Sequence, residues 1–331
     1  MDLPAADRQF VPAAQAVERF AHGLTALWPA FGKDDGKCLA LAVSGGPDST
    51  ALLLLAAAAF PGRIEVATVD HRLRPESAGE AADVARLCVV LGVPHRTIEV
   101  EVGEGNVQAQ ARHARYDALA QWMHERGLPA LATAHHADDQ AETLLLRLNR
   151  ASGVAGLAGA RERGVVPGTD LALLRPLLGW RRSELVTIVD LAGVPAAQDP
   201  SNLDDKYDRA RLRKSLAVAD WLDVPSIAAS AAHLADADAA LDWAAQREWH
   251  ERVVKDGPGL TYRPAAPKAI ALRVLMRIVS ELDGQEPRGG GVARVFDALV
   301  RGETVSIGNL VARPALEGWT FRSSPRPRRK S

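Results

Sequence analysis

The stretch CLALAVSGGPDSTALLLLAAAAF, residues 38–60, joins two apolar segments through a polar turn. Cys38–Val43 has the pattern of a buried strand, and Pro47 suits the first turn of a following helix, where its missing N–H costs nothing. The turn therefore presents free backbone amides at a helix N-terminus, and Gly45 and Gly46 let an anion approach closely. The stretch predicts a strand, a phosphate-binding turn and a helix.

The turn is predicted to bind the pyrophosphate part of a nucleotide through Ser44, Gly45, Gly46, Pro47, Asp48 and Ser49. It has neither the lysine of the GxxxxGK[ST] motif nor the spacing of GxGxxG, so those two nucleotide sites are excluded. Without a lysine, the phosphate charge is expected to be met partly by Mg²⁺, with Asp48 as its ligand. A capped turn without a ligand is the alternative, but it explains only the serine and aspartate residues and not two adjacent glycines.

Between Lys37 and Ser152, short apolar runs alternate with helical patterns. Strands are expected at residues 38–43, 63–70, 95–100, 130–135 and 171–180, and helices at 48–60, 76–92, 106–127, 138–150 and 181–194. This alternation predicts an α/β fold with a doubly wound, Rossmann-like parallel sheet and helices on its faces. In such sheets ligands bind at the carboxyl ends of the strands.

The predicted organisation has three parts. Residues 1–36 form an N-terminal helix and connector, residues 37–215 form the catalytic, nucleotide-binding domain, and residues 216–331 form a smaller, mainly α-helical C-terminal domain. Ala-rich helical patterns at 226–254 and 266–282 lead into a Gly-rich break. The basic tail after Phe321 is expected to be disordered.

The composition fits a globular chain of 331 residues with 47% hydrophobic residues, long enough for more than one domain. No basic region followed by an apolar one opens the chain, and the longest apolar run is interrupted, so neither a secretory signal nor a membrane span is predicted. The protein is expected in the cytoplasm. Its two cysteines have no CxxC or Cys/His spacing, which disfavours disulfide scaffolds, zinc ribbons and cysteine-ligated clusters.

The SGGxDS pattern resembles the PP-loop of the ATP-pyrophosphatase superfamily, whose members cleave ATP between the α and β phosphates to adenylate a substrate oxygen. Within it, four further stretches resemble the tRNA(Ile)-lysidine synthase family: VDHRLRPESAGEA (69–81), AHHADDQAET (134–143), RASGVAGLAG (150–159) and QDPSNLDDKYDRARLR (198–213). Ala151 and Ala210 depart from the family pattern, which has glycine and asparagine there. The resemblance covers residues 39–213.

The resemblance implies that the chain converts the wobble cytidine of the CAU-anticodon isoleucine tRNA to lysidine, with ATP, Mg²⁺ and free L-lysine. The cytidine C2 oxygen attacks the α phosphate and releases pyrophosphate, and the lysine amine then attacks C2 and expels AMP. Another PP-loop tRNA-modifying enzyme, such as a sulfur transferase, is the runner-up. A non-catalytic ATP sensor or RNA-binding module is a third interpretation. Whether the chain forms a homodimer is left open.

Acidic residues open the helix that follows the strand ending near His135. Asp138, Asp139 and Glu142 are grouped there by their spacing. The resemblance makes Asp139 and Glu142 the candidates to hold the ammonium groups of lysine, with His135 nearby. Acids that only complement the helix dipole, and a metal site built from histidines and acids, are the alternatives.

The remaining site candidates come from three places in the sequence. The resemblance implies that the end of the second strand lies near the adenine of ATP. The residues there are Val69, Asp70 and His71. Arg115 shares a helix face with Arg112 and is the candidate to stabilise charge on the α phosphate, although surface charge is the simpler interpretation. The basic segment 206–216 is expected to contact tRNA phosphates, unless it is only a solvated helix face. Its candidates are Arg209, Arg211 and Arg213.

Overall fold

The computed structural model describes residues 10–33, 36–72, 76–101, 103, 107–197, 208–285, 287 and 289–323. The chain divides into two compact units, Met1–Leu234 and Ala235–Ser331. The first unit contains the helices α1 (Ala14–Leu27), α2 (Pro29–Lys33), α3 (Pro47–Ala59), α4 (Ser77–Leu91), α5 (Val107–Arg126), α6 (Ala137–Leu148), α7 (Val154–Leu157), α8 (Arg182–Ala192) and α9 (Asp208–Val218). Helix α10 (Val224–Arg252) runs across the division.

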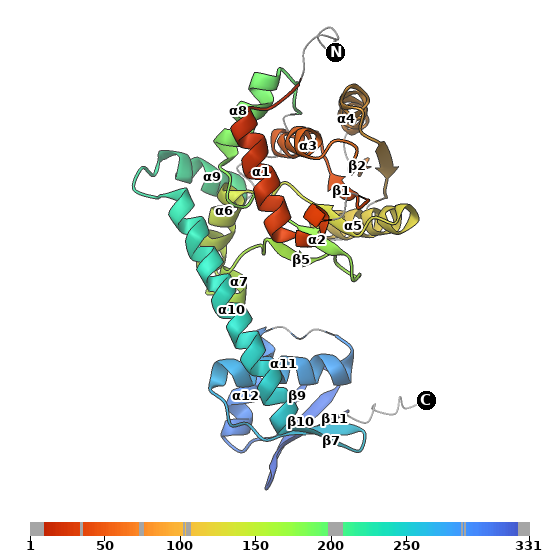
Figure 1. The fold of residues 1–331 in the computed structure, drawn as a ribbon. Coiled ribbons are helices and arrows are strands. Elements are labelled where there is room, and N and C mark those ends of the chain that lie inside the picture. The colour runs from red at the N-terminus through yellow and green to blue at the C-terminus, as the bar shows by residue number, and fades with distance from the viewer. Residues whose placement is uncertain are drawn as a thin grey trace. The chain divides into compact units, whose positions relative to one another are not determined.

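The first unit is built on one six-stranded sheet (Figure 1). Its strands are β1 (Leu39–Ala42), β2 (Ile64–Asp70), β3 (His95–Glu99), β4 (Ala130–Ala132), β5 (Arg163–Val165) and β6 (Ala172–Leu174). Their order is β3-β2-β1-β4-β6-β5, and all neighbours are parallel except β5, which pairs antiparallel with β6. The predicted doubly wound parallel sheet is confirmed, and β5 is an edge strand that the sequence does not predict.

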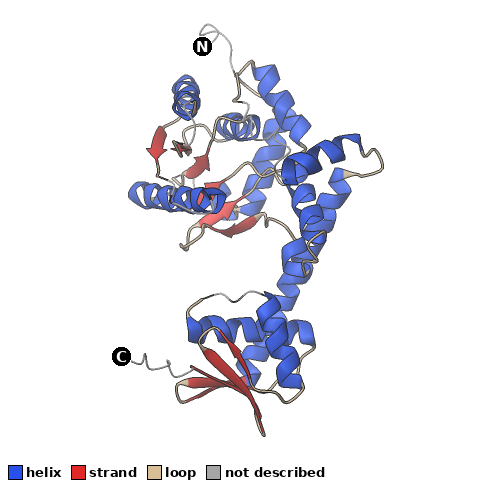
Figure 2. Cartoon of the chain, turned by 180° about the vertical axis from the view of Figure 1, so that it is seen from behind, coloured by secondary structure: helices blue, strands red, loops and turns tan. Residues whose placement is uncertain are grey.

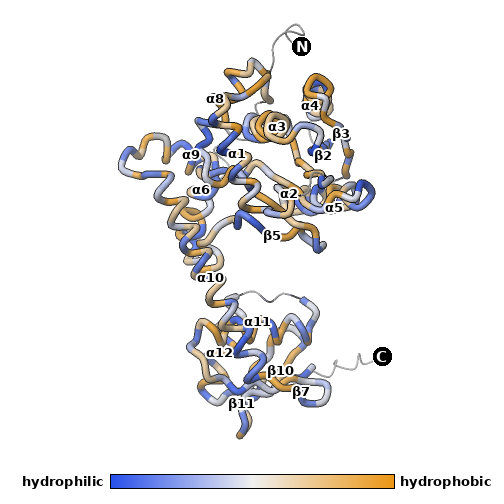
Figure 3. The backbone as a smooth tube through the Cα atoms, viewed as in Figure 1, coloured by the Kyte–Doolittle hydropathy of each residue, from blue (hydrophilic) through white to orange (hydrophobic). Residues whose placement is uncertain are grey.

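Helices cover both faces of this sheet (Figure 2). Alternate residues of β1 belong to different clusters, Leu39 and Leu41 to one and Ala40 to the other, as the two-residue repeat of a strand requires. Helix α3 packs on the first face with α1 and α8, and after its polar first turn it is apolar (Figure 3), as a helix buried on all sides requires. Helix α5 packs on the second face through Tyr116 and Met123.

The second unit combines helices with a five-stranded antiparallel sheet. It contains β7 (Val253–Asp256), β8 (Gly259–Tyr262), α11 (Lys268–Asp283), α12 (Gly289–Val300), β9 (Val305–Ile307), β10 (Leu310–Ala315) and β11 (Gly318–Ser323). The strand order is β7-β8-β11-β10-β9. The predicted helices at 226–254 and 266–282 are present as α10 and α11, and the sheet is an addition to them.

The prediction of a break at the Gly-rich stretch 289–291 is wrong. These glycines form the first turn of α12. Val292, Val295 and Leu299 of this helix are buried in the core of the second unit. Burial of one apolar face outweighs the low helix propensity of glycine, because tertiary packing provides most of the stability of a short helix.

Part of the predicted organisation falls outside the described residues, namely 1–9, the whole QDPSNLDDKY segment (198–207) and the tail from residue 324. The domain boundary after residue 215 stays a prediction. In the structure, residue 215 lies within α9, which packs against α6 of the first unit. Within the described part of the chain, every helix is too short or too polar to cross a membrane.

Candidate active site

The turn between β1 and α3 is organised by its own hydroxyl groups. Ser49 Oγ accepts a hydrogen bond from the Ser44 amide at 3.1 Å and donates to the Gly46 carbonyl at 3.0 Å. Gly45 has φ +88°, a conformation that side chains with a Cβ rarely adopt. Gly46 occupies the N-cap position of α3 and offers no capping side chain, so the first-turn amides remain available to an anion. The backbone of the turn can therefore donate hydrogen bonds to an anion.

Asp48 lies directly beside this turn with one carboxylate oxygen unused. Its Oδ1 is buried without a hydrogen-bond partner, 3.8 Å from Arg182 Nε, and its Oδ2 lies 3.5 Å from His136 Nε2. The described residues contain no group of three or more metal-ligating side chains. Mg²⁺ suits such a place, because it commonly binds one or two carboxylates together with substrate phosphates and water. The residues present therefore fit a magnesium ion held between Asp48 and a bound nucleotide.

His136 connects Asp48 to the first turn of α6. Its side chain is 1% exposed, its Nδ1 accepts from the Asp139 amide at 3.4 Å, and the Asp139 carboxylate accepts from the His136 amide at 3.2 Å. These reciprocal bonds form a capping box. Burial lowers the pKa of His136, but hydrogen bonding to Asp48 and the charge of Asp139 outweigh burial and raise this pKa above its ordinary value. His136 is not among the predicted site residues.

The other acids of α6 each face an arginine. Arg181 donates two hydrogen bonds of 3.2 Å to Asp138. Arg213 donates two to Glu142, at 2.7 and 3.1 Å, and Glu142 is only 1% exposed. We refer to the four carboxylates as the acidic side of the site: Asp48, Asp138, Asp139 and Glu142. The predicted grouping of acids is present, but basic partners within the protein neutralise it.

Three arginines on α5 and directly after β6 have no such carboxylate partner among the residues that the structure describes. We refer to them as the arginine side of the site: Arg112, Arg115 and Arg175. His135 Nδ1 lies 2.9 Å from Thr133 Oγ1. Burial lowers the pKa of His135 to about 4; Asp139 opposes this shift and the three arginines add to it. Burial also lowers the pKa of His71, and Arg115 adds to that shift. Arg115 thus influences both predicted histidines.

The end of β2 is shaped by Asp70. This residue is 6% exposed, and its Oδ1 accepts a hydrogen bond of 2.8 Å from the amide of Arg72. A hydrogen bond from Ser77 is the largest influence on the pKa of Asp70, which is lowered. Val69 packs with the cluster under α5. Asp70 therefore holds the turn after β2 in place, and His71 presents a buried Nδ1 without a hydrogen-bond partner.

The three arginines predicted to contact tRNA are separated by the fold. Arg209 and Arg211 are exposed on α9, where Arg209 donates to Thr143 Oγ1 at 3.4 Å and Arg211 pairs with Asp208 at 2.5 Å. Arg213 instead reaches inward to Glu142. The structure thus brings Arg213 into the acidic side, together with Arg181 and Arg182, which the sequence did not identify.

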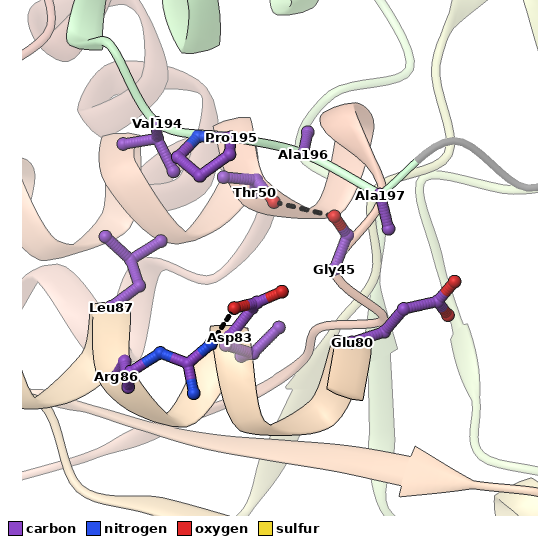
Figure 4. Close-up of a pocket in the computed structure, with 11 residues that line it drawn as sticks. Gly45, Thr50, Glu80, Asp83, Arg86, Leu87, Val194, Pro195, Ala196 and Ala197 are labelled. Carbon is purple, nitrogen blue, oxygen red and sulfur yellow. Dashed lines mark hydrogen bonds and ion pairs between the residues drawn. The ribbon is translucent and has the colours of Figure 1, made fainter. Parts of the chain in front are cut away.

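A cavity of about 170 Å³ lies next to the turn between β1 and α3 (Figure 4). Its apolar lining comes from α4 and from the segment after α8, and Gly45 is the only predicted site residue in it. The Ala197 amide donates to the Gly45 carbonyl at 2.9 Å, which holds this segment against the turn. No member of the acidic or arginine side lines the cavity, so it adjoins the charged site without forming part of it.

The cysteines give no sign of sulfur chemistry. Cys88 is buried in α4, and burial raises the pKa of its thiol to about 12. Cys38 is half-buried, and both thiols are free. A thiolate nucleophile needs a lowered pKa and access to solvent. Cys88 meets neither condition.

Comparison with known proteins agrees with this geometry. The model of the PP-loop domain family matches residues 17–219. The tRNA(Ile)-lysidine synthase of Novosphingobium aromaticivorans is 46% identical over 91% of this chain and 93% of its own, and that of Zymomonas mobilis is 41% identical over 88% and 90%. The fold is also that of the U34-tRNA thiolase NcsA from Methanococcus maripaludis, with a TM-score of 0.52, 13% identity, and coverage of 66% of this chain and 76% of that one. The chain belongs to the tRNA(Ile)-lysidine synthase family.

Proposed function

We propose that this protein ligates free L-lysine to C2 of the wobble cytidine in the CAU-anticodon isoleucine tRNA, consuming ATP and releasing AMP and pyrophosphate. The observation that carries the proposal is the preformed phosphate turn with Asp48 and the acidic first turn of α6 beside it. The relatives that share most of the chain carry the same name. A tRNA substrate places the reaction in the cytoplasm, and a homodimer stays open.

The first step is the adenylation of the cytidine C2 oxygen. It is needed because oxide is a poor leaving group, whereas AMP is a good one. We assign the pyrophosphate part of ATP to the amides of the PP-loop turn and the adenine to the neighbourhood of Val69 and His71. We assign to Arg115 the stabilisation of charge on the α phosphate. When bound at Asp48, Mg²⁺ would neutralise charge on the pyrophosphate leaving group.

The second step is attack of the lysine amine on C2. We assign the lysine ammonium groups to the acidic side, with direct contact at Asp139, whose side chain is 25% exposed. Glu142 is fully engaged by Arg213 and buried, so its part is to hold that arginine at the site. His135 is neutral at physiological pH, because burial lowers its pKa to about 4. It can therefore accept a hydrogen bond or a proton beside the reacting amine.

An assay with an isoleucine tRNA transcript, ATP and radiolabelled lysine tests the proposal. We expect lysine to enter the tRNA with one AMP formed per lysine, and no incorporation when the wobble cytidine is replaced by uridine. The sulfur-transferase alternative predicts incorporation of labelled sulfur instead, and the burial of Cys88, which raises its pKa to about 12, speaks against this thiol as the sulfur carrier. Binding of ATP and tRNA without pyrophosphate release would indicate a non-catalytic module and overturn the proposal.

A further inference from the structure

The arginine side surrounds one buried tyrosine. The guanidinium carbons of Arg112 and Arg115 both lie 5.0 Å from the centre of the Tyr116 ring, and Arg175 lies near its hydroxyl group. Among the described residues, none of the three arginines forms an ion pair with a carboxylate. The buried Nε atoms of Arg115 and Arg175 have no hydrogen-bond partner there. Positive charge is concentrated here without a negative counterpart in the described part of the protein.

Arg175 is the most unusual of the three because it is buried. It is 9% exposed, and its Nη1 donates to the Arg161 carbonyl at 2.6 Å. Burial lowers its pKa, and repulsion from Arg112 adds to this shift. A buried charge without a counter-ion is costly. The hydrogen bond to the Arg161 carbonyl gives Nη1 a structural role. It does not explain why Nε is buried without a hydrogen bond, or why no described carboxylate pairs with this arginine.

The position of Arg175 indicates which anion it meets. It follows β6 directly, and β6 is two strands from β1, whose end forms the PP-loop turn. Neighbouring strands are about 4.8 Å apart, so the two strand ends are separated by about 10 Å. His135 follows β4, which lies between them. The pyrophosphate is assigned to the turn after β1 and the adenine to the end of β2. An anion bound by Arg175 at the end of β6 would therefore lie on the opposite side of the reaction centre from ATP.

We propose that Arg175 and Arg112 bind a backbone phosphate of the tRNA next to the wobble cytidine. This inference rests on the proposed function, because it takes the polynucleotide to be the second substrate. A guanidinium fork matches a phosphodiester in two hydrogen bonds, and a contact of this kind fixes position without reading sequence. Holding the phosphate over β6 would orient the C2 oxygen toward the α phosphate near Arg115. Arg112 and Arg175 are thus positioning residues for the RNA.

The test uses the full chain with Arg175→Gln and measures the dissociation constant of unmodified tRNA at several salt concentrations. We expect weaker binding, by roughly tenfold to a hundredfold, and a salt slope reduced by about 0.7 to 0.9, because one phosphate is no longer neutralised. The dissociation constant of ATP should not change. Arg163→Gln is the matched control, since Arg163 is exposed on the neighbouring strand β5 and should leave both measurements as in the wild type.

Each other outcome overturns the inference. If Arg175→Gln weakens ATP binding and leaves the tRNA salt slope unchanged, the phosphate belongs to ATP. If only the melting temperature falls, Arg175 is a structural residue. Should Arg175→Gln not fold, the exposed Arg112→Gln provides the same slope measurement. Failure of the proposed function would show separately, as absence of lysine incorporation by the wild-type chain.

Discussion

The acidic side lies after β1 and β4, and the arginine side on α5 and after β6, and the two sides differ in how their charges are paired. On the acidic side, Asp138 pairs with Arg181 and Glu142 with Arg213, while His136 lies between Asp48 and Asp139. On the arginine side, no cation has a carboxylate partner among the residues that the structure describes. Two of the four carboxylates on the acidic side, Asp138 and Glu142, are thus paired with arginines inside the protein. The arginine side has no such pairs, and we propose that substrate phosphates meet its charge.

The difference predicts how each side responds to substitution. Removing one charge of an ion pair on the acidic side leaves the other charge without its partner. The free energy of unfolding should therefore fall together with activity. Removing a cation from the arginine side relieves repulsion in the free protein, so its effects should be largest in the substrate complexes. The exception on the acidic side is Asp48, whose buried Oδ1 accepts no hydrogen bond and is only 3.8 Å from Arg182 Nε.

Asp48→Asn should therefore have the largest effect on activity. It removes the charge expected at the magnesium-pyrophosphate contact, and metal stabilisation of a leaving group is worth several kcal/mol, or at least about a hundredfold in rate. Pyrophosphate release from ATP and tRNA measures it. Asp190→Asn, an exposed carboxylate on α8, is the control. If a folded Asp48→Asn protein releases pyrophosphate at the wild-type rate, Asp48 has no part in the reaction.

Arg213→Ala should have the largest effect on stability. It leaves the buried carboxylate of Glu142 without its partner, which costs about 3 to 5 kcal/mol in the free energy of unfolding. Arg211→Ala breaks an exposed pair on the same helix and should cost at most about 1 kcal/mol. Urea denaturation compares the two variants. Adding Glu142→Gln to Arg213→Ala should restore part of the stability; equal effects of the two arginine variants would contradict the assignment of Arg213.

Asp139→Asn tests the lysine contact. Asparagine keeps an acceptor for the capping box but loses the charge, so KM for lysine should rise by roughly tenfold to a hundredfold while KM for ATP changes little. Asp138→Asn should raise KM for lysine less, because Asp138 is satisfied by Arg181. If the two variants raise KM for lysine by the same factor, the lysine ammonium does not bind at Asp139.

The sequence predicts the first unit much better than the second. The expected strand at 38–43 is observed as Leu39–Ala42, and that at 95–100 as His95–Glu99, because long apolar and helical patterns alternate there. The strands of the second unit are not predicted. Val253–Asp256 and Gly259–Tyr262 have only four residues each, and alternation over so few positions does not stand out beside Ala-rich helices.

For the site, the sequence identifies the chemistry but not the pairing. His135 and His136 are adjacent, and only the extended backbone at the N-cap of α6 decides that His136 faces Asp48. The pair between Glu142 and Arg213 joins residues that are 71 positions apart in the chain. Arg175 lies outside the stretches that carry the family resemblance, so its burial is visible only in the structure. Short-range patterns cannot report such long-range contacts.

The two histidines should give opposite pH effects on stability. Burial lowers the pKa of His135 to about 4, so its contribution to stability falls as the pH drops from about 6.5 towards 4. The pKa of His136 is raised, so its contribution is full below about 6.5 and is lost as the pH rises through the raised value. On going from pH 7.5 to 5, His135→Gln should therefore gain stability relative to the wild type and His136→Gln should lose it. Urea unfolding at both values decides this, and shifts of the same sign would refute the comparison.

Neutralising Arg209 and Arg211 should have the smallest effect, because both lie on the exposed face of α9, outside either side of the site. If they touch tRNA phosphates, Arg209→Gln with Arg211→Gln should reduce the salt slope of tRNA binding by about 0.7 to 0.9 for each phosphate that is no longer neutralised. Lysine and ATP KM values should not change, because Arg209 bonds to Thr143 and Arg211 to Asp208, which belong to neither side of the site. Arg213 is left intact in this variant, since its replacement would add the stability cost of the Glu142 pair. An unchanged salt slope would make these two arginines part of a solvated helix face and leave the arginine side as the main electrostatic contact for RNA.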